Sequence, residues 1–145
     1  MKSEPSEYSI DDLARDRQSS WFGVRNYLSR NYMRDSMRVG DRVLFYHSSC
    51  PVPGIYGIAR VASEAHDDET QFIVWDKHYE PRSTRDRALW QCVDVAYVST
   101  LAEPLTLSRI RETQWLEIMR ILQRGNRLSI TPVSEEEWGI IERMM

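Results

Sequence analysis

The feature that most constrains the fold is an unbroken run of strand-forming residues, Val43 to His47, directly after a turn at residues 39–41. Val-Gly-Asp is a turn signal, because Gly adopts positive φ at little cost and Asp bonds back to nearby backbone. Apolar and aromatic side chains then occupy both alternating faces of the run, so both faces need cover from other elements. The sequence therefore predicts a central strand with the rest of the chain packed around it.

Turn and capping signals place shorter elements on either side of this strand. Ser9 followed three residues later by Asp12 matches a capping box, which marks the start of a short helix. Gly57 interrupts the next apolar run and indicates a bulge or a close approach of another segment. The full pattern predicts helices over residues 10–15, 25–33, 107–110, 115–122 and after Ser134, strands over residues 55–65, 90–98 and 128–133, and a loop at residues 18–20.

These elements fit one domain spanning residues 1–145, since a chain of this length buries a sizeable core without a second domain. The expected fold class is α+β, a small mixed sheet curled into a partial barrel with short helices at its margins. No apolar run approaches the roughly 20 residues of a membrane helix, and the polar opening residues are unlike a secretion signal. We therefore expect a monomeric cytoplasmic protein, or a nuclear one if its source is eukaryotic, without membrane contact.

The cysteines and histidines predict neither a disulfide nor a metal site. Cys50 and Cys92 do not form a C-x-x-C pair, so we expect two reduced thiols. His47 and Cys50 lack the two or three further ligands at regular spacing that zinc requires. No phosphate loop or other cofactor motif is present, and we expect no cofactor.

Blocks of residues in a fixed order along nearly the whole chain resemble the EVE domain family. The blocks are Lys2–Pro5, Tyr8–Leu13, Trp21–Tyr27, Gly40–Asp41, Phe45–Ser48, Pro53–Gly57, Arg127–Ser129 and Pro132–Val133. Several blocks of four or more residues are far more specific than a single short motif. The resemblance implies a PUA-like fold, a small β-barrel related to the YTH and ASCH domains. It also implies a module that reads modified bases in nucleic acid, with modified cytosine in DNA as the ligand proposed for the family and RNA as the alternative polymer.

The chain departs from the family at its start. Members usually carry a few more residues, including an aromatic-aliphatic pair, ahead of the Lys-Ser-Glu-Pro block, whereas Met1 directly precedes Lys2 in this sequence. We expect a short opening strand as a result. Residues added ahead of Met1 should then raise the thermal stability, because an edge strand would gain ladder hydrogen bonds and apolar cover.

A reader of one flipped base needs an aromatic surface that stacks on the base and polar groups that meet its edge. Trp21 and Tyr46 can stack, while Arg25 can meet a base edge or a phosphate. Each residue also has a structural interpretation: Trp21 as core, Asn26 as a helix cap and Ser129 as a turn hydroxyl. The candidate base-binding residues are Ser3, Trp21, Val24, Arg25, Asn26, Tyr46, His47, Ser48, Arg127 and Ser129.

The charge pattern predicts phosphate contacts in one basic segment. The net charge of −3 argues against a strongly electrostatic nucleic-acid binder, but it says nothing about how charges are distributed. Arg82, Arg85 and Arg87 lie close together in the sequence, and we expect them to bind phosphates. A solvated surface of mixed charges is the simpler interpretation of the same residues.

An enzyme is the alternative function. Lys2, Ser3 and Glu4 bring an amine, a hydroxyl and a carboxylate together, and some ASCH relatives resemble small amidohydrolases that act on modified nucleosides. Adjacent strand residues point to opposite faces, however, so the three groups do not converge easily. No complete catalytic set is visible elsewhere, and the sequence therefore favours a binding module over an enzyme.

Overall fold

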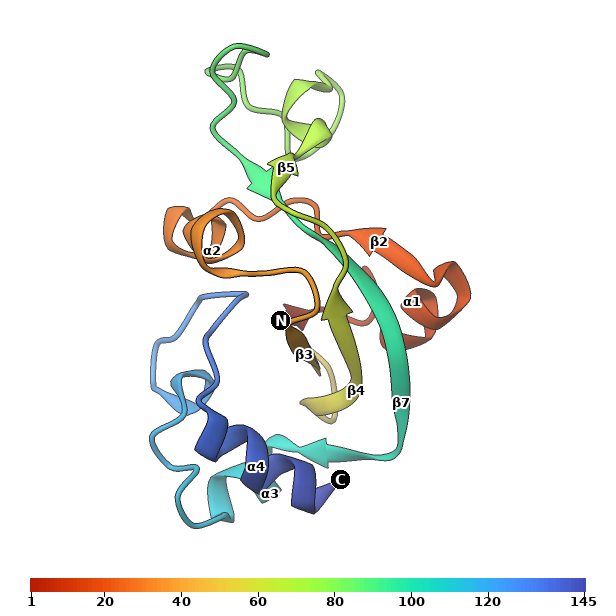
Figure 1. The fold of residues 1–145 in the computed structure, drawn as a ribbon, viewed down its shortest axis with the longest axis vertical. Coiled ribbons are helices and arrows are strands. Elements are labelled where there is room, and N and C mark those ends of the chain that lie inside the picture. The colour runs from red at the N-terminus through yellow and green to blue at the C-terminus, as the bar shows by residue number, and fades with distance from the viewer.

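The computed structural model describes residues 1–145, and its frame is a curled sheet of five strands in the order β1-β3-β4-β7-β2 (Figure 1). The strands are β1 (Lys2–Ser3), β2 (Gln18–Ser20), β3 (Arg42–His47), β4 (Gly54–Val61) and β7 (Asp94–Thr106). β1 runs parallel to β3 and the other pairs are antiparallel, so the sheet is mixed. The expected α+β class with a curled mixed sheet is confirmed.

Short helices flank the sheet, and a separate two-stranded ribbon leads into an extra lobe (Figure 1). The α-helices are α1 (Ile10–Asp16), α2 (Tyr27–Asn31), α3 (Leu107–Glu112) and α4 (Glu135–Met144), joined by a π-helix (Tyr32–Ser36), two 3₁₀ turns (Glu69–Phe72 and Arg120–Leu122) and the ribbon strands β5 (His66–Asp67) and β6 (Gln91–Cys92). The predicted capping box at Ser9 is present in α1, and Ser134 with Glu137 forms a second one at the start of α4.

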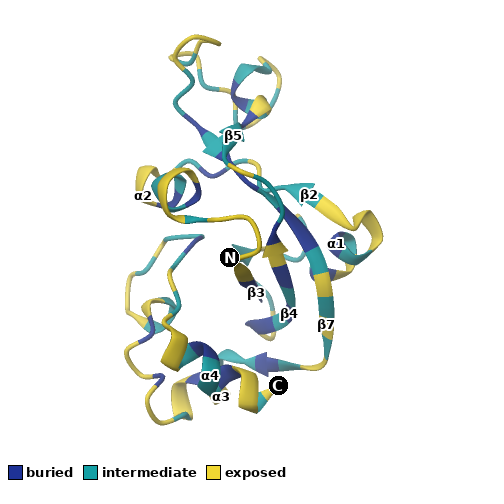
Figure 2. Ribbon diagram, in the orientation of Figure 1, coloured by how far each residue is buried: buried dark blue, intermediate teal, exposed yellow.

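β3 is the buried strand that the sequence predicts. Val43 and Phe45 pack into one apolar cluster on one face, and Leu44 and Tyr46 pack into a second cluster on the other face. Figure 2 shows this burial along the inner strands, with exposed residues concentrated on the helices and loops. The strand therefore separates two cores, and each core is closed by different segments of the chain.

Gly57 has both properties that its position in the strand indicates. The pairing register shifts on both sides of it, which marks an irregularity in β4. A Cβ atom at Gly57 would also lie 2.6 Å from Ile10 Cγ1 and 2.6 Å from the Ser99 carbonyl oxygen. Only glycine therefore lets α1 lie this close to the sheet.

Three sequence-based assignments are wrong. Residues 18–20 form strand β2 because the antiparallel neighbour β7 is long enough to pair with them. Trp115 adopts a left-handed conformation, with φ of 72°, so the predicted helix over residues 115–122 reduces to a 3₁₀ turn. Residues 128–133 form no strand, because β1 is only two residues long and its Lys2 N–H alone bonds to Ser129 O.

Residues 68–90, here called the polar lobe, project beyond the sheet next to β5 (Figure 1). The centre of the lobe is Gln71, a fully buried side chain whose polar atoms are all hydrogen-bonded. Its amide donates to the carbonyl oxygens of Asp68 and Trp90, and its oxygen accepts from Trp90 N–H and from the Ser83 hydroxyl. A satisfied polar network of this kind holds the lobe in one conformation.

Candidate functional site

A polar cavity of about 610 Å³ opens between the start of the chain, the loop before α2, and the polar lobe. Seven of the ten predicted base-binding residues line it: Ser3, Trp21, Val24, Arg25, Asn26, Arg127 and Ser129. These residues come from three segments far apart in the sequence. The structure thus gathers most of the predicted set around one space large enough for a nucleobase.

Trp21 has one side in the core and another on the cavity. Its ring meets Phe45 edge-on, with centroids 5.5 Å apart and an angle of 82° between the planes. Its backbone N–H donates to Val93 O, which ties the start of the loop to the sheet region. Trp21 therefore forms an aromatic wall of the cavity, and its packing against Phe45 holds the ring in place. The residue can belong to the core and also contact a ligand.

Gly23 lets the loop after Trp21 close against the polar lobe. Its φ is 81°, a left-handed conformation that favours glycine, and a Cβ there would lie 2.6 Å from His78 Nε2. The Gly23 N–H donates to Asp68 Oδ2 at 2.8 Å. The backbone of the loop and the lobe are thus joined directly at the cavity wall.

Arg25 serves the scaffold, because all five of its N–H donors are used within the protein. Nε and Nη2 donate to His78 O, Nη2 also donates to Thr70 Oγ1, and Nη1 donates to Val24 O and Asp68 Oδ2. No donor remains for a base edge or a phosphate. The guanidinium lines the cavity but acts by fixing its shape.

Asp68 is the partner that makes this arrangement possible. It is only 1% exposed, and it accepts hydrogen bonds from Gly23, Arg25 and Thr70. Burial by itself raises the pKa of Asp68, but the hydrogen bonds from Thr70, Gly23 and Arg25 together hold the pKa below its usual range. The carboxylate is therefore ionised, and it joins the loop before α2 to the lobe.

Asn26 is both a helix cap and a free amide. Its Oδ1 accepts from Ser29 N–H at 3.0 Å, which caps α2. Its Nδ2 makes no hydrogen bond within the protein, and the exposed residue is part of the cavity lining. The side chain can therefore donate to a ligand without giving up the cap.

Tyr46, His47 and Ser48 do not line this cavity, which corrects their placement in the site. Tyr46 lies in the core cluster on the opposite face of β3. His47 is 5% exposed, stacks on Tyr56, and accepts from Ile10 N–H at the start of α1 through Nε2. Ser48 donates its N–H to Ser3 O in the ladder with β1. The end of β3 contacts α1 and β1, and this packing places the three residues outside the polar cavity.

The buried histidine has a structural role of its own. Burial lowers the pKa of His47, although Asp11 partly opposes this shift. The neutral ring can accept a hydrogen bond at Nε2, whereas a charged ring could not. His47 thus satisfies one of the free N–H groups at the N-terminus of α1.

The predicted phosphate-binding arginines lie outside the cavity. Arg82 pairs with Glu80 and Arg85 pairs with Glu69, while Arg87 lies in the same turn of the lobe without an ion pair. Arg127 and Lys2 line the cavity and form no ion pair. These two cations are unpaired positive charges in the lining of the cavity.

Sequence reasoning missed two groups of site residues. Asp68 lies in an acidic run that reads as solvent-exposed surface, and its partner Arg25 is 43 residues away. Lys77 and His78 line the cavity from the lobe, and Lys77 pairs with Glu7 at 3.1 Å. No local pattern could have indicated these contacts.

The groups proposed for catalysis do not form a catalytic arrangement. The Ser3 hydroxyl donates to the Tyr8 carbonyl oxygen at 2.7 Å, and neither Lys2 nor Glu4 hydrogen-bonds to it. A nucleophile needs a base within hydrogen-bond reach. No cluster of three or more histidine, cysteine, aspartate or glutamate side chains has an arrangement that could hold a metal ion.

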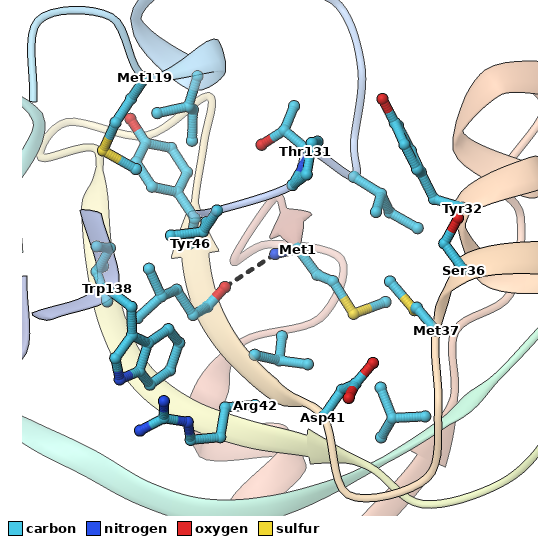
Figure 3. Close-up of a pocket in the computed structure, with 18 of the residues that line it drawn as sticks. Met1, Tyr32, Ser36, Met37, Asp41, Arg42, Tyr46, Met119, Thr131 and Trp138 are labelled. Atoms are coloured by element: carbon cyan, nitrogen blue, oxygen red, sulfur yellow. Dashed lines mark hydrogen bonds between the residues drawn. The ribbon is translucent and has the colours of Figure 1, made fainter. Parts of the chain in front are cut away.

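A second, apolar cavity of about 240 Å³ lies beside Met1, between β3 and the segment before α4 (Figure 3). Its walls are mainly core side chains, with Tyr46, Met119 and Trp138 on one side and Met37 and Tyr32 on the other. Such walls offer few partners for the polar edge of a base. The polar cavity is therefore the better candidate for nucleic acid.

The apolar cavity continues the line of β1 along the edge of β3. The Met1 amine donates to Leu44 O, and Tyr46 N–H donates to Met1 O (Figure 3). Because the N–H and C=O of one strand residue point to the same side, the Leu44 N–H also faces this edge. Burial lowers the pKa of the Met1 amine to about 5, with Lys2 adding to the shift.

An apolar, strand-forming extension of a few residues ahead of Met1 should raise the melting temperature at neutral pH. It would fill the cavity, pair with Leu44 N–H, and replace a buried ionisable amine by an amide.

The same amine makes stability depend on pH. Since the folded pKa of the Met1 amine is lowered, the unfolded chain binds more protons than the folded protein between about pH 5 and 8. Stability should therefore rise with pH over this range in the chain beginning at Met1, and less so in the extended one. A Gly-Ser extension of equal length is the control, and an apolar extension that melts no higher than it contradicts the prediction.

The curled mixed sheet and its short flanking helices define a PUA-like domain, with a candidate ligand cavity beside its first strand. The chain matches the EVE domain model over residues 1–144, and it therefore belongs to the EVE domain family. The resemblance seen in the sequence blocks is thus confirmed over almost the whole chain.

Named relatives and solved structures agree with this assignment. Thymocyte nuclear protein 1 of Homo sapiens is 36% identical over 160 residues, which cover 97% of this chain and 70% of the relative. A crystal structure from Pseudomonas putida has a TM-score of 0.96 at 44% identity, covering 99% of this chain and 96% of its own. The crystal structure of human THYN1 protein in complex with DNA containing 5-methylcytosine has a TM-score of 0.92 at 34% identity, covering 99% of this chain and 94% of its own.

The helices of the fold are all short. None of them combines the length and the apolar character that crossing a membrane requires.

Proposed function

We propose that this protein binds a modified cytosine, flipped out of DNA, in the polar cavity and does not convert it chemically. The observation that carries the proposal is Trp21, an aromatic ring supported by Phe45 on one side and lining a polar cavity. The human relative crystallised with 5-methylcytosine DNA supports modified cytosine as the ligand. The hydrogen-bonded Ser3 hydroxyl gives no support to the amidohydrolase alternative.

The cavity residues suggest a division of roles. Trp21 would stack on the flipped base, and such stacking is worth about 1–3 kcal/mol per base. The free amide of Asn26 and the hydroxyl of Ser129 supply a donor and an acceptor for the base edge. Lys2 and Arg127 would meet the phosphates on either side, because their charges are unpaired.

The arginines of the lobe would add phosphate contacts outside the cavity. Arg87 is free to contact a phosphate, whereas Arg82 and Arg85 would first have to exchange their carboxylate partners. Each phosphate contact steepens the salt dependence of binding. We propose further that the protein binds DNA as a monomer. It would be cytoplasmic in a bacterial cell and could be nuclear in a eukaryotic one.

A binding panel tests the proposed function. DNA and RNA oligonucleotides of one sequence, each with one cytosine either unmodified or modified, are titrated with the protein at several salt concentrations. We expect tighter binding to DNA with modified cytosine and no chemical change in the oligonucleotide. Equal binding to every member of the panel would contradict the proposal.

Asn26→Asp should reduce the preference for the modified base without loss of stability. Aspartate keeps the oxygen that caps α2 but removes the free amide donor of this cavity-lining residue. The ratio of the affinities for modified and unmodified oligonucleotides should fall, because the base edge loses its partner. Using this ratio cancels the effect of the added charge on phosphate binding. An unchanged ratio would remove Asn26 from the base contacts.

A further inference from the structure

Trp75 is the most exposed large apolar side chain in the protein, with 90% of its surface accessible to solvent. The neighbouring Val74 is also exposed. Both lie in the polar lobe, and Trp75 precedes by two residues Lys77, which lines the polar cavity. A fully exposed indole next to a binding site is unusual, because aromatic rings lose much of their favourable burial when they stay in water.

The segment that carries Trp75 is held in a defined shape. Asp76 N–H donates to Ile73 O, Tyr79 N–H donates to Asp76 O, and His78 N–H donates to the Asp76 carboxylate. Arg25 then fastens the segment to the cavity wall through two hydrogen bonds to His78 O. Trp75 is thus presented on an anchored turn and not on a loose loop.

The position of this turn relative to the cavity suits insertion into a duplex. Two residues span at most about 7 Å, so the backbone of Trp75 lies within about two base-pair steps of the cavity wall at Lys77. Lys2 and Arg127 line the same cavity and carry unpaired charges that complement phosphates, and Lys77 is an exposed cation paired only with the exposed Glu7. The neighbourhood therefore favours nucleic acid over an apolar protein surface as the partner of this ring.

We propose that Trp75 enters the DNA stack at the place that the flipped cytosine vacates. This inference rests on the proposed function, since the vacancy exists only if a base is flipped. Flipping leaves the two neighbouring base pairs without a stacking partner, and an inserted apolar or aromatic side chain restores part of that stacking. Trp21 would then hold the base outside the helix while Trp75 fills the gap inside it.

The inference is tested by comparing duplex and single-stranded DNA that carry the same modified cytosine. We expect Trp75→Ala to weaken duplex binding about tenfold, the usual scale for loss of one base-aromatic stack. Binding to the single strand should be unchanged, because a single strand has no gap to fill. Trp75→Phe keeps an aromatic ring and should recover most of the duplex affinity.

Trp115→Ala is the matched control. Trp115 is 70% exposed but lies beside α4, in the C-terminal part of the chain opposite the lobe in Figure 1. Its removal should leave both affinities unchanged. If Trp75→Ala binds the duplex as well as wild type, or weakens both forms equally, the gap-filling role is overturned while the proposed function stands. A wild-type protein that binds no DNA overturns both.

Discussion

Replacing Asp68 by alanine should lower the free energy of unfolding by about 3–5 kcal/mol, because the change leaves a partly buried guanidinium without its carboxylate. It also removes the acceptor of Gly23 N–H and of Thr70, so only the bonds from Arg25 to Thr70 and to the His78 carbonyl still join the loop before α2 to the lobe. Urea denaturation of wild type and variant measures the difference.

A surface ion pair provides the control for Asp68. Glu69 is the next residue and pairs with Arg85 at 2.7 Å, but both side chains are largely exposed. Glu69→Ala should cost no more than about 1 kcal/mol, as is usual for surface pairs. Equal losses in the two variants would mean that Asp68 is not the link between loop and lobe.

The pH dependence of stability follows from the same carboxylate. The folded pKa of Asp68 is lowered, so its ionised form stabilises the folded protein above the unfolded pKa. This contribution is lost as the pH falls through the folded pKa. Asp68→Ala should therefore also show a flatter loss of stability in acid than wild type.

Trp21→Ala should weaken binding to modified and unmodified DNA alike, by about 1–3 kcal/mol, or roughly five- to 150-fold. The Trp21 ring would stack on any base, whereas the polar groups that contact the base edge would select the modified base. The variant should still unfold cooperatively, since Phe45 and the other buried residues of its core cluster are unchanged. Parallel titrations of the two oligonucleotides and a thermal melt give these quantities.

Two outcomes would contradict this role for Trp21. A variant that folds and binds as wild type would place the base elsewhere, and a variant that is unfolded would make Trp21 a core residue first. Trp21→Phe separates the possibilities, because it keeps a ring against Phe45 and should retain most of the affinity. Phe22→Ala, at an exposed neighbour in the same loop, should have a smaller effect.

Local signals in the sequence account for much of the fold. The capping boxes at Ser9 and Ser134 mark two helices, and Gly57 marks the contact with α1. β3 was predictable because both of its faces are apolar, which leaves no alternative to burial on both sides. These features depend on residues close together in the chain, and the sequence displays them directly.

The site was only partly predictable because its geometry depends on distant segments. His47 and Ser48 end a buried strand, but the helix and strand that cover them come from the first residues of the chain. Strand alternation already puts His47 on the same face as Phe45, which indicates a buried ring. Arg25 appeared free to bind a ligand because its partners, Asp68 and the His78 carbonyl, lie more than 40 residues away.

The central claim, that a flipped modified cytosine occupies the cavity lined by Trp21, is tested most directly by a crystal structure of this protein with DNA containing 5-methylcytosine. We expect the methylated base against the Trp21 ring, with its polar edge near the Asn26 amide and with Arg25 still bonded to Asp68. A base found in the apolar cavity beside Met1, or left stacked in the duplex with the polar cavity empty, would contradict the account.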